Sequence, residues 1–264
     1  MMRTKLISCL LFLSACFLTG CMSPPPPASS SLGRQDLITG QPQQALTFYG
    51  AVFDWTATRK GSEAYWEWTT SGGVPVGGLI TLPDAGEGAL WLTTVFVQDL
   101  SGTLVKVTEN AGTVLHGPVS VRGGRTAVIQ APDGSRLQLR ESGASGRTEP
   151  WIWLELFSGN PADSAAWLQN VFSLETRNAE SGDRIFLLAE GEPVAAVSSG
   201  PFEDAPAQWV PVLGVENLGA TVFLLLERGG KVLKSSEDSE RRVALVSDPQ
   251  NALLLLQQTR GNTP

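Results

Sequence analysis

Val97-Gln98-Asp99-Leu100 and, 118 residues later, Val215-Glu216-Asn217-Leu218 open two stretches of this sequence that match along their length. Each stretch continues through spaced apolar residues to a second matching tetrapeptide, Gly112-Thr113-Val114-Leu115 or Gly230-Lys231-Val232-Leu233. Two more landmarks recur in the same order at offsets of 118 and 119 residues: Gly73-Val74-Pro75-Val76 with Gly191-Glu192-Pro193-Val194, and residues 48–53 with residues 167–172. These long offsets indicate a duplicated domain, because arrays of small repeats have periods of about 20–50 residues.

Each repeat has the pattern of two β-α-β-β-β modules. In the first repeat, a strand through Asp36-Leu37-Ile38 precedes a helix that Gln41-Pro42 opens, where proline removes no helical hydrogen bond. Apolar residues at helical spacing give this helix one buried face. The expected order continues with strands at 56–58, 64–69 and 75–81, then a strand at 91–97, a helix at 99–110 and strands at 113–116, 125–130 and 135–139. The second repeat follows the same order, so we expect four modules in two domains, at residues 33–143 and 148–259.

The amino terminus is typical of a secreted protein. Arg3 and Lys5 precede an apolar stretch at residues 6–18 that is too short to span a bilayer comfortably. The stretch ends in Leu18-Thr19-Gly20-Cys21, which resembles the bacterial lipobox, in which the cysteine is lipidated and becomes the new amino terminus. We expect a signal peptide at residues 1–20 and lipidation of Cys21; the alternative is an ordinary signal peptide.

The next residues form a tether. Residues 21–32 contain four consecutive prolines, which favour an extended chain, and four serines. Met22 lacks the aspartate associated with inner-membrane retention, so we expect an outer-membrane lipoprotein that faces the periplasm or the cell surface. Cys9 and Cys16 lie in the leader, so Cys21 is the only cysteine of the mature chain and an internal disulfide is impossible.

The charge of the chain disfavours a nucleic-acid partner. The formal net charge is −7, and removal of Arg3 and Lys5 with the leader takes it to about −9. Binding to a phosphate backbone needs clustered lysine and arginine.

A resemblance to a known family rests on the end of the first helix. Phe48-Tyr49-Gly50-Ala51-Val52-Phe53-Asp54-Trp55 resembles the Phe-Tyr-x-x-Val-Phe-Gly-Trp helix end of the vicinal oxygen chelate superfamily, which includes glyoxalase I, bleomycin-resistance proteins and extradiol dioxygenases. Three other segments fall where that superfamily has them: Val74-Pro75-Val76-Gly77-Gly78, His116-Gly117-Pro118 and Pro132-Asp133-Gly134. The resemblance covers residues 33–258, although Asp54 replaces the usual glycine and the second repeat has Ser173-Leu174 there. It implies an α+β fold of tandem glyoxalase-like domains, whose four modules form cupped mixed sheets with helices outside.

Enzymes of this superfamily hold a divalent metal ion with side chains at set places on the strands, usually histidine and glutamate. The resemblance puts these positions at Arg34, Glu67, Leu92 and Gln138 in the first repeat and at Trp153, Ile185, Val210 and Leu255 in the second. Transition-metal ions need imidazole or anionic oxygen and sulfur, whereas an arginine repels a cation. Whether modules pair within a repeat or between repeats, no arrangement supplies more than two possible ligands, so we expect no metal and no other cofactor.

Other catalytic chemistry has little support. The single histidine, His116, stands beside a predicted turn and is interpreted as a loop-edge residue, which leaves a serine triad without its base. No phosphate loop or dinucleotide motif is present. Glu67 is a weak candidate for a catalytic base, and Arg34 could bind an anion; the alternative is a structural ion pair between the two.

Aromatic residues offer a binding role instead. Five tryptophans lie on predicted strands: Trp66, Trp68, Trp91, Trp151 and Trp153. Aromatic walls suit flat or apolar ligands, and the alternative is that the rings pack in the core. The candidate ligand-pocket residues are Arg34, Tyr65, Glu67, Trp91, Gln138 and Trp153.

These observations favour a membrane-anchored lipoprotein that binds a small apolar or aromatic molecule without a metal and without catalysis. One alternative is a metal-dependent lyase, isomerase or dioxygenase of the superfamily with a non-standard site. Another is a structural or interaction protein whose cavities are filled by side chains. The duplication predicts a monomer that contains an internal pseudo-dimer.

Overall fold

A computed structural model describes residues 31–61, 64–82, 88–121, 123–141, 150–202, 206–237 and 242–259. Cys21, the predicted signal peptide and most of the predicted tether lie outside these residues. The strands of the first repeat are β1 (Ser31–Thr39), β2 (Thr56–Arg59), β3 (Tyr65–Thr69), β4 (Pro75–Thr81), β5 (Ala89–Val97), β6 (Thr113–Val121), β7 (Gly124–Gln130) and β8 (Arg136–Glu141). Those of the second are β9 (Trp151–Ser158), β10 (Glu175–Asn178), β11 (Arg184–Ala189), β12 (Glu192–Ser199), β13 (Gln208–Val215), β14 (Lys231–Glu237), β15 (Arg242–Ser247) and β16 (Leu253–Gln258).

Each repeat forms one mixed sheet of eight strands. The orders are β2-β3-β4-β1-β5-β8-β7-β6 and β10-β11-β12-β9-β13-β16-β15-β14, so the same topology occurs twice. The two modules of a repeat join through antiparallel pairing at the centre of the sheet, β1 with β5 and β9 with β13. Strand pairing therefore takes place within a repeat, and the predicted α+β fold of four β-α-β-β-β modules is confirmed.

The four helices begin at short capping signals. They are α1 (Pro42–Phe53), α2 (Leu100–Glu109), α3 (Pro161–Phe172) and α4 (Leu218–Glu227). Side chains of Asp99, Asn160 and Asn217 accept hydrogen bonds from the first turns of α2, α3 and α4, and α1 and α3 each start with proline. None of the described helices is long and apolar enough to cross a membrane.

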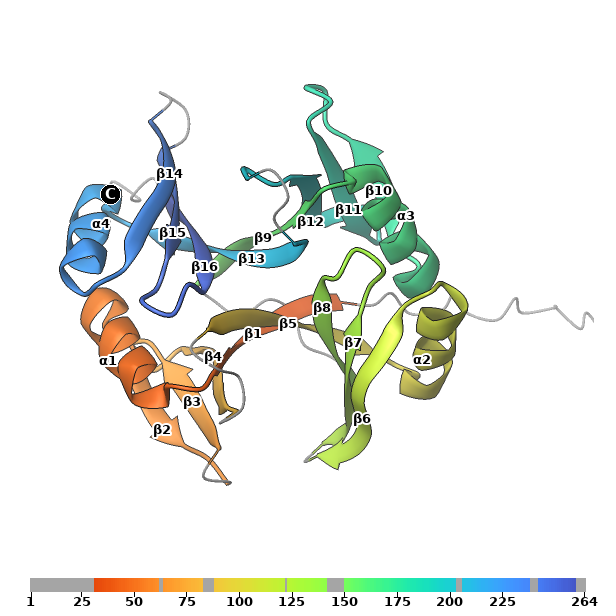
Figure 1. Ribbon diagram of the computed structural model, residues 1–264, viewed down its shortest axis with the longest axis horizontal. Helices are drawn as coiled ribbons and strands as arrows, with labels where there is room; N and C mark the ends of the chain where they lie inside the picture. Colours follow the sequence, from red (N-terminus) through yellow and green to blue (C-terminus); the bar gives the residue numbers. More distant parts are fainter. Residues whose placement is uncertain are drawn as a thin grey trace, which may run out of the picture.

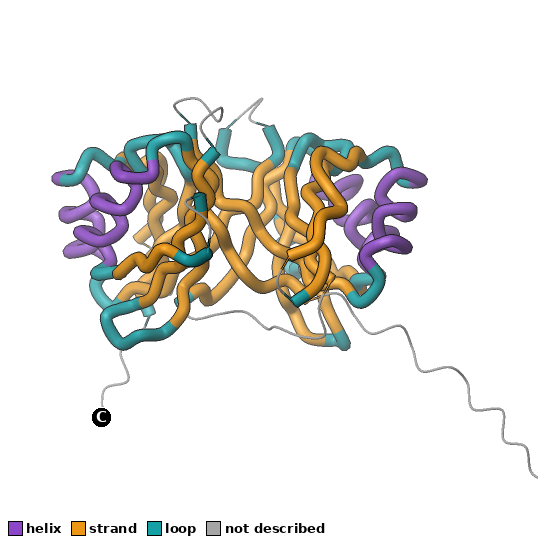
Figure 2. The backbone as a smooth tube through the Cα atoms, turned by 90° about the horizontal axis from the view of Figure 1, so that it is seen from below, coloured by secondary structure: helices purple, strands orange, loops and turns teal. Residues whose placement is uncertain are grey.

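The two sheets lie back to back and curve away from each other, with α1 beside α4 at one end and α2 beside α3 at the other (Figure 1). The view from below shows the helices at the two ends and the strands between them (Figure 2). Each sheet consequently has one face toward the other repeat and a concave face toward solvent. We call the concave face of the first sheet the first cup and that of the second sheet the second cup.

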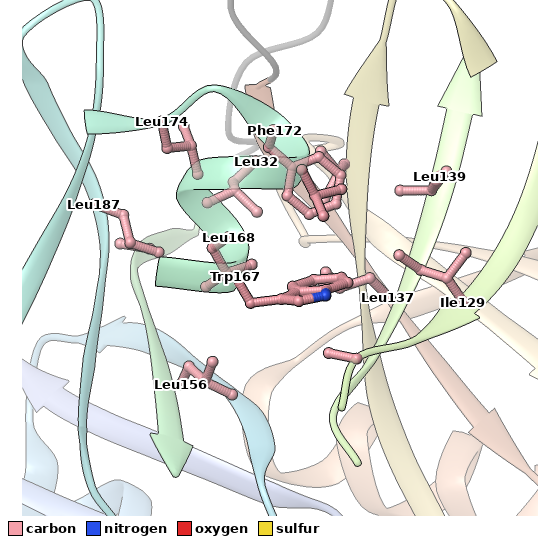
Figure 3. Packing of buried hydrophobic residues seen from close by; sticks show 14 of the residues in the cluster. Leu32, Ile129, Leu137, Leu139, Leu156, Trp167, Leu168, Phe172, Leu174 and Leu187 are labelled. Carbon is pink, nitrogen blue, oxygen red and sulfur yellow. The ribbon is translucent and has the colours of Figure 1, made fainter. Parts of the chain in front are cut away.

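Each hydrophobic core is shared between the repeats. One cluster joins Ile129 and Leu137 of the first repeat with Leu168 and Phe172 of α3, and Trp167 of α3 points toward the first repeat (Figure 3). The indole nitrogen of Trp167 donates at 2.9 Å to the carbonyl oxygen of Asn110, the residue that follows α2. The hydrophobic core of one repeat is thus continuous with that of the other.

The second cluster is built from aromatic rings. Trp91 on β5 packs against Tyr49 of α1 and against Trp151 on β9, with ring centroids 5.4 and 5.1 Å apart. Trp151 donates to the carbonyl oxygen of Val76 at 2.7 Å, and the hydroxyl of Tyr49 donates to Asp248 at 3.1 Å. Burial raises the pKa of the Asp248 carboxyl, although backbone hydrogen bonds and the Tyr49 hydroxyl oppose the rise. These contacts fix the second repeat against the first.

Hydroxyl groups at the ends of the first strands make matching links between the repeats. Thr39, the last residue of β1, hydrogen-bonds the side chain of Gln250 in the second repeat. Ser158, the last residue of β9, lies 2.7 Å from the hydroxyl of Ser164, which donates to Asp133 of the first repeat at 2.6 Å. Because these groups are buried or half-buried, the links add specificity to the apolar interface.

The start of α2 is held by a carboxylate from the last strand of the same sheet. Glu141 accepts the amide of Leu100 at 3.2 Å and forms two bonds with Arg125, at 2.7 and 2.8 Å. In the second repeat the neutral Gln258 takes the same place, between the amide of Leu218 and the guanidinium of Arg242. The hydrogen bond from Arg125, with the backbone bond, lowers the pKa of Glu141 to about 2.

Deletion of residues 148–264 should leave a first repeat that aggregates or dimerises, because α1 and α2 lose the helices that cover them. Size-exclusion chromatography with light scattering measures this directly, with the full chain, which we expect to be a monomer, as the control. A folded, monomeric fragment would contradict the shared core.

Glu141→Gln should lower the melting temperature at pH 7, and its difference from the wild type should shrink as the pH falls from about 4.5 to about 2. The folded-state pKa is depressed from 4.5 to about 2, so the carboxylate stabilises the fold above pH 4.5 and loses this effect as it is protonated. Glu109→Gln, at the exposed end of α2, is the matched control. Melting curves with a pH-independent difference for Glu141→Gln would show that its charge does not contribute.

Candidate functional site

The first cup contains a cavity of about 820 Å³. The strand register places Glu67, Asp36 and Leu92 in one row across β3, β1 and β5. Gln138 on β8 lies beside Thr94 on β5. Most of the cavity wall is aliphatic, from side chains on five strands and an adjoining loop: Ile38, Ile80, Leu82, Leu90, Leu92, Leu115, Val119 and Val128. A volume of this size suits a small-molecule ligand.

Polar groups in the wall are few and lie on β6, β7 and β8. They belong to His116, Thr126, Arg136 and Gln138. The Gln138 amide nitrogen donates to the Thr126 hydroxyl at 3.0 Å, while its amide oxygen is buried without a hydrogen-bond partner among the described residues. His116 was expected at the edge of a loop, and this expectation is wrong: it lies within β6, opposite Val128, and lines the cavity.

A charged network lies on the same concave face, next to the cavity on β1 and β3. Arg34 Nε donates to Asp36 Oδ1 at 2.8 Å, and Arg34 Nη2 donates to the hydroxyl of Tyr65. Gly78 makes room for this network, since a Cβ there would lie 2.5 Å from Asp36 Oδ1 and 2.7 Å from the Tyr65 oxygen. Burial and the Asp36 charge raise the pKa of Tyr65 to about 12, although Arg34 opposes the rise.

Glu67 is not the partner of Arg34, so the expected ion pair between them is not present. Glu67 lies instead 3.6 Å from Lys60, whose side chain is exposed, whereas the Glu67 side chain is only partly exposed. The closer partner, Asp36, is 3% exposed and stands two residues after Arg34 on the same face of β1. The alternation of a strand was the signal that could have identified Asp36 from the sequence.

The second cup has a buried carboxylate at the matching position. Glu155 on β9 is 1% exposed and accepts hydrogen bonds from Ser198 at 2.7 Å and Trp153 at 3.1 Å. It also forms a salt bridge with Arg184, with 3.1 Å between the charged atoms. The Trp153 ring also packs edge-on against Phe186. Trp153 therefore lies in the second cup, as part of a satisfied structural network.

A second cavity, of about 680 Å³, lies in the second cup at the place that corresponds to the first cavity. Its wall differs, because Phe157 and Phe202 contribute aromatic rings and Lys234 contributes a cation. Lys234 occupies the position that His116 has in the first repeat, 118 residues earlier. The duplication has thus produced two cups of unlike chemistry.

Trp91 is not a cup residue. It is 1% exposed and points to the opposite face of β5 from Leu92, where its ring packs in the aromatic core. Trp68 is also fully buried in that core, and Trp66 packs against it. Successive residues of a strand point to opposite faces, so the strands that carry the cup also supply the core.

The residues at the superfamily's metal positions do not fit a metal ion. In the first cup, Arg34 is a guanidinium bound to a carboxylate, Leu92 has no donor atom, and only Glu67 and Gln138 have side-chain oxygens. In the second cup the strand register pairs Phe186 with Ala196, and Ala196 with Glu155. Phe186, rather than Ile185, therefore stands at the metal position that Glu67 has in the first cup. Ile185 points to the core side, because a shift of one residue reverses the face. No group of three histidine, cysteine, aspartate or glutamate side chains arranged to hold a metal occurs in the described ranges.

The sequence matches no protein-family model and no curated protein. Solved structures do match the fold. A Mn(II)-bound glyoxalase from Novosphingobium aromaticivorans superimposes with a TM-score of 0.61 and 11% sequence identity, covering 88% of this chain and 83% of the glyoxalase. A 2,2',3-trihydroxybiphenyl 1,2-dioxygenase from Sphingomonas wittichii superimposes with a TM-score of 0.59 and 13% sequence identity, covering 88% of this chain and 91% of the dioxygenase.

A catechol 2,3-dioxygenase gives a TM-score of 0.57 at 11% identity, covering 90% of this chain and 95% of the dioxygenase. The match therefore extends over both repeats and over nearly the whole of each solved structure. At these identities it concerns the fold alone. The chain has the tandem-domain fold of the vicinal oxygen chelate superfamily, which glyoxalases and extradiol dioxygenases share.

Proposed function

We propose that this protein binds a small apolar molecule in the first cup, without a metal ion and without catalysis. The observation that carries the proposal is the cavity of about 820 Å³, whose wall is mainly aliphatic and contains few polar groups. Ligand sites in proteins have this composition, in which apolar surface supplies most of the affinity and a few polar groups set the orientation.

The polar residues of the first cup support binding rather than catalysis. Arg34, Asp36 and Tyr65 already satisfy one another, and Glu67 is paired with Lys60. A general base needs a position within hydrogen-bond reach of the proton that it removes. Glu67 stays the weak candidate for such a role, and the cavity wall itself contains no carboxylate among its described residues.

The alternative of a metal-dependent lyase, isomerase or dioxygenase draws on the fold, since the solved neighbours include a Mn(II)-bound glyoxalase and dioxygenases. The residues at the metal positions of the first cup disfavour such an enzyme, because Arg34 and Leu92 stand where two of the metal ligands would be. The other alternative, a structural protein with filled cups, is disfavoured by the open volume in the first cup.

We further propose that the protein is anchored through a lipidated Cys21 in the outer membrane and faces the periplasm or the cell surface. The lipobox-like residues and the proline-rich tether support this anchor. The tether would hold the folded repeats away from the bilayer, so that the first cup stays accessible.

A panel of aliphatic and aromatic apolar compounds should contain ligands that raise the melting temperature of the purified protein. A ligand at one hundred times its Kd stabilises a fold by about 2.7 kcal/mol, which raises the melting temperature by about 5–11 °C for a chain of this size. Val128→Trp should abolish this shift because the larger side chain fills the first cavity. Thr47→Trp, on the exposed side of α1, is the matched control and should keep the shift.

Metal dependence is measured on the same protein, purified without chelator or tag histidines and challenged with zinc, nickel, manganese and iron. Elemental mass spectrometry should find no stoichiometric metal, and ligand binding should survive chelation. Stoichiometric metal together with chelator-sensitive binding would favour the metal-dependent enzyme. Val128→Trp protein that is folded and still binds every ligand would overturn the assignment to the first cup.

A further inference from the structure

We propose that the ligand of the first cup is a molecule with a single aliphatic chain and an anionic head group, and that Arg136 binds the head. This inference rests on the proposed function, because it names the chemical class of the ligand for the same cavity.

The wall of the first cavity is aliphatic. Its apolar side chains are isoleucine, leucine, valine and alanine, and no phenylalanine, tyrosine or tryptophan lies among its described lining residues. The second cavity has the rings of Phe157 and Phe202 in its wall. Aromatic ligands gain from stacked or edge-on contacts with large apolar rings, and the first cavity offers only the imidazole of His116 for such contacts. A flexible alkyl chain can fill an irregular aliphatic wall by dispersion contacts.

The rim of the first cavity continues the apolar surface outward. Leu82, Leu115 and Val119 line the cavity and are 46%, 43% and 38% exposed. Large aliphatic side chains exposed together at the mouth of a cavity are typical of a binding site. They would cover the part of an alkyl chain that extends beyond the cavity.

The charge of the cavity is positive. Arg136 is the one arginine or lysine among the described lining residues, which include no aspartate or glutamate. It lies exposed at the start of β8, and no salt bridge joins it to a described carboxylate. The corresponding residue of the second repeat is Leu253, so this cation is particular to the first cup. An exposed guanidinium in the wall of an aliphatic cavity matches a carboxylate or a phosphate.

Isothermal titration calorimetry on the purified protein tests this with four probes below their micelle-forming concentrations: dodecanoate, dodecyl phosphate, dodecanol and 1-naphthoate. At least one of the two anionic alkyl probes should bind as one molecule per chain, more tightly than 1-naphthoate. The tighter of the two identifies the head group as a carboxylate or a phosphate. Its affinity should fall with added salt, because Arg136 is exposed.

Arg136→Gln should weaken binding of the anionic alkyl probe about tenfold, the loss expected for one charge-assisted hydrogen bond. The same variant should change dodecanol binding by less than about twofold. Lys234→Gln, which removes the cation of the second cavity, is the matched control and should change neither affinity.

Three results would overturn the inference while the proposed function stands, provided that Val128→Trp abolishes the binding. The first is that 1-naphthoate binds more tightly than either anionic alkyl probe. The second is that Arg136→Gln weakens the binding of dodecanol and of the anionic probe equally. The third is that Arg136→Gln weakens the binding of neither probe. A loss in Lys234→Gln in place of Arg136→Gln would move the site to the second cup. Absence of binding by all four probes and by the wider apolar panel would overturn the proposed function as well.

Discussion

The shared helix–sheet core is the constraint on which the rest of this structure depends. The helices of each repeat pack on their own sheet and against a helix of the other repeat, and both hydrophobic clusters combine residues of the two repeats. Trp167 extends from the second repeat toward the first, and Trp91 and Trp151 meet across the interface. Large aromatic rings give such an interface both buried area and directional contacts. Because this packing occupies the inner face of both sheets, it leaves the concave faces free for other uses.

The two concave faces have diverged in different directions. Each retains a buried carboxylate at the equivalent strand position, Asp36 in the first cup and Glu155 in the second, and each carboxylate is paired with an arginine. In each cup this ion pair engages the charged side chains that lie beside the superfamily's metal positions. The cavities that remain lie next to them, with an aliphatic wall and Arg136 in one and aromatic rings with Lys234 in the other. A duplicated binding surface can change one copy while the shared core stays constant.

Sequence reasoning succeeded where periodicity was regular and failed where the face of a single residue mattered. The helix expected from Gln41-Pro42 to residue 53 is α1, and the strand expected at 75–81 is β4. His116 was misassigned because β6 continues to Val121 through glycine and proline, which usually end a strand. Ile185 was misassigned by one residue, which on a strand exchanges the cup for the core.

The sequence by itself determined the duplication, the order of the strands and helices, the scarcity of metal-donor residues at the superfamily positions, and the restriction of cysteine to the amino-terminal segment. These properties follow from local pattern and residue chemistry, which need no knowledge of distant contacts. Only the tertiary structure decided that Trp91 is core, that Arg34 binds Asp36, and that Arg136 and His116 line an open aliphatic cavity. Those outcomes depend on strand register, on the curvature of the sheets and on packing between residues that are distant in the sequence, and no local pattern specifies them.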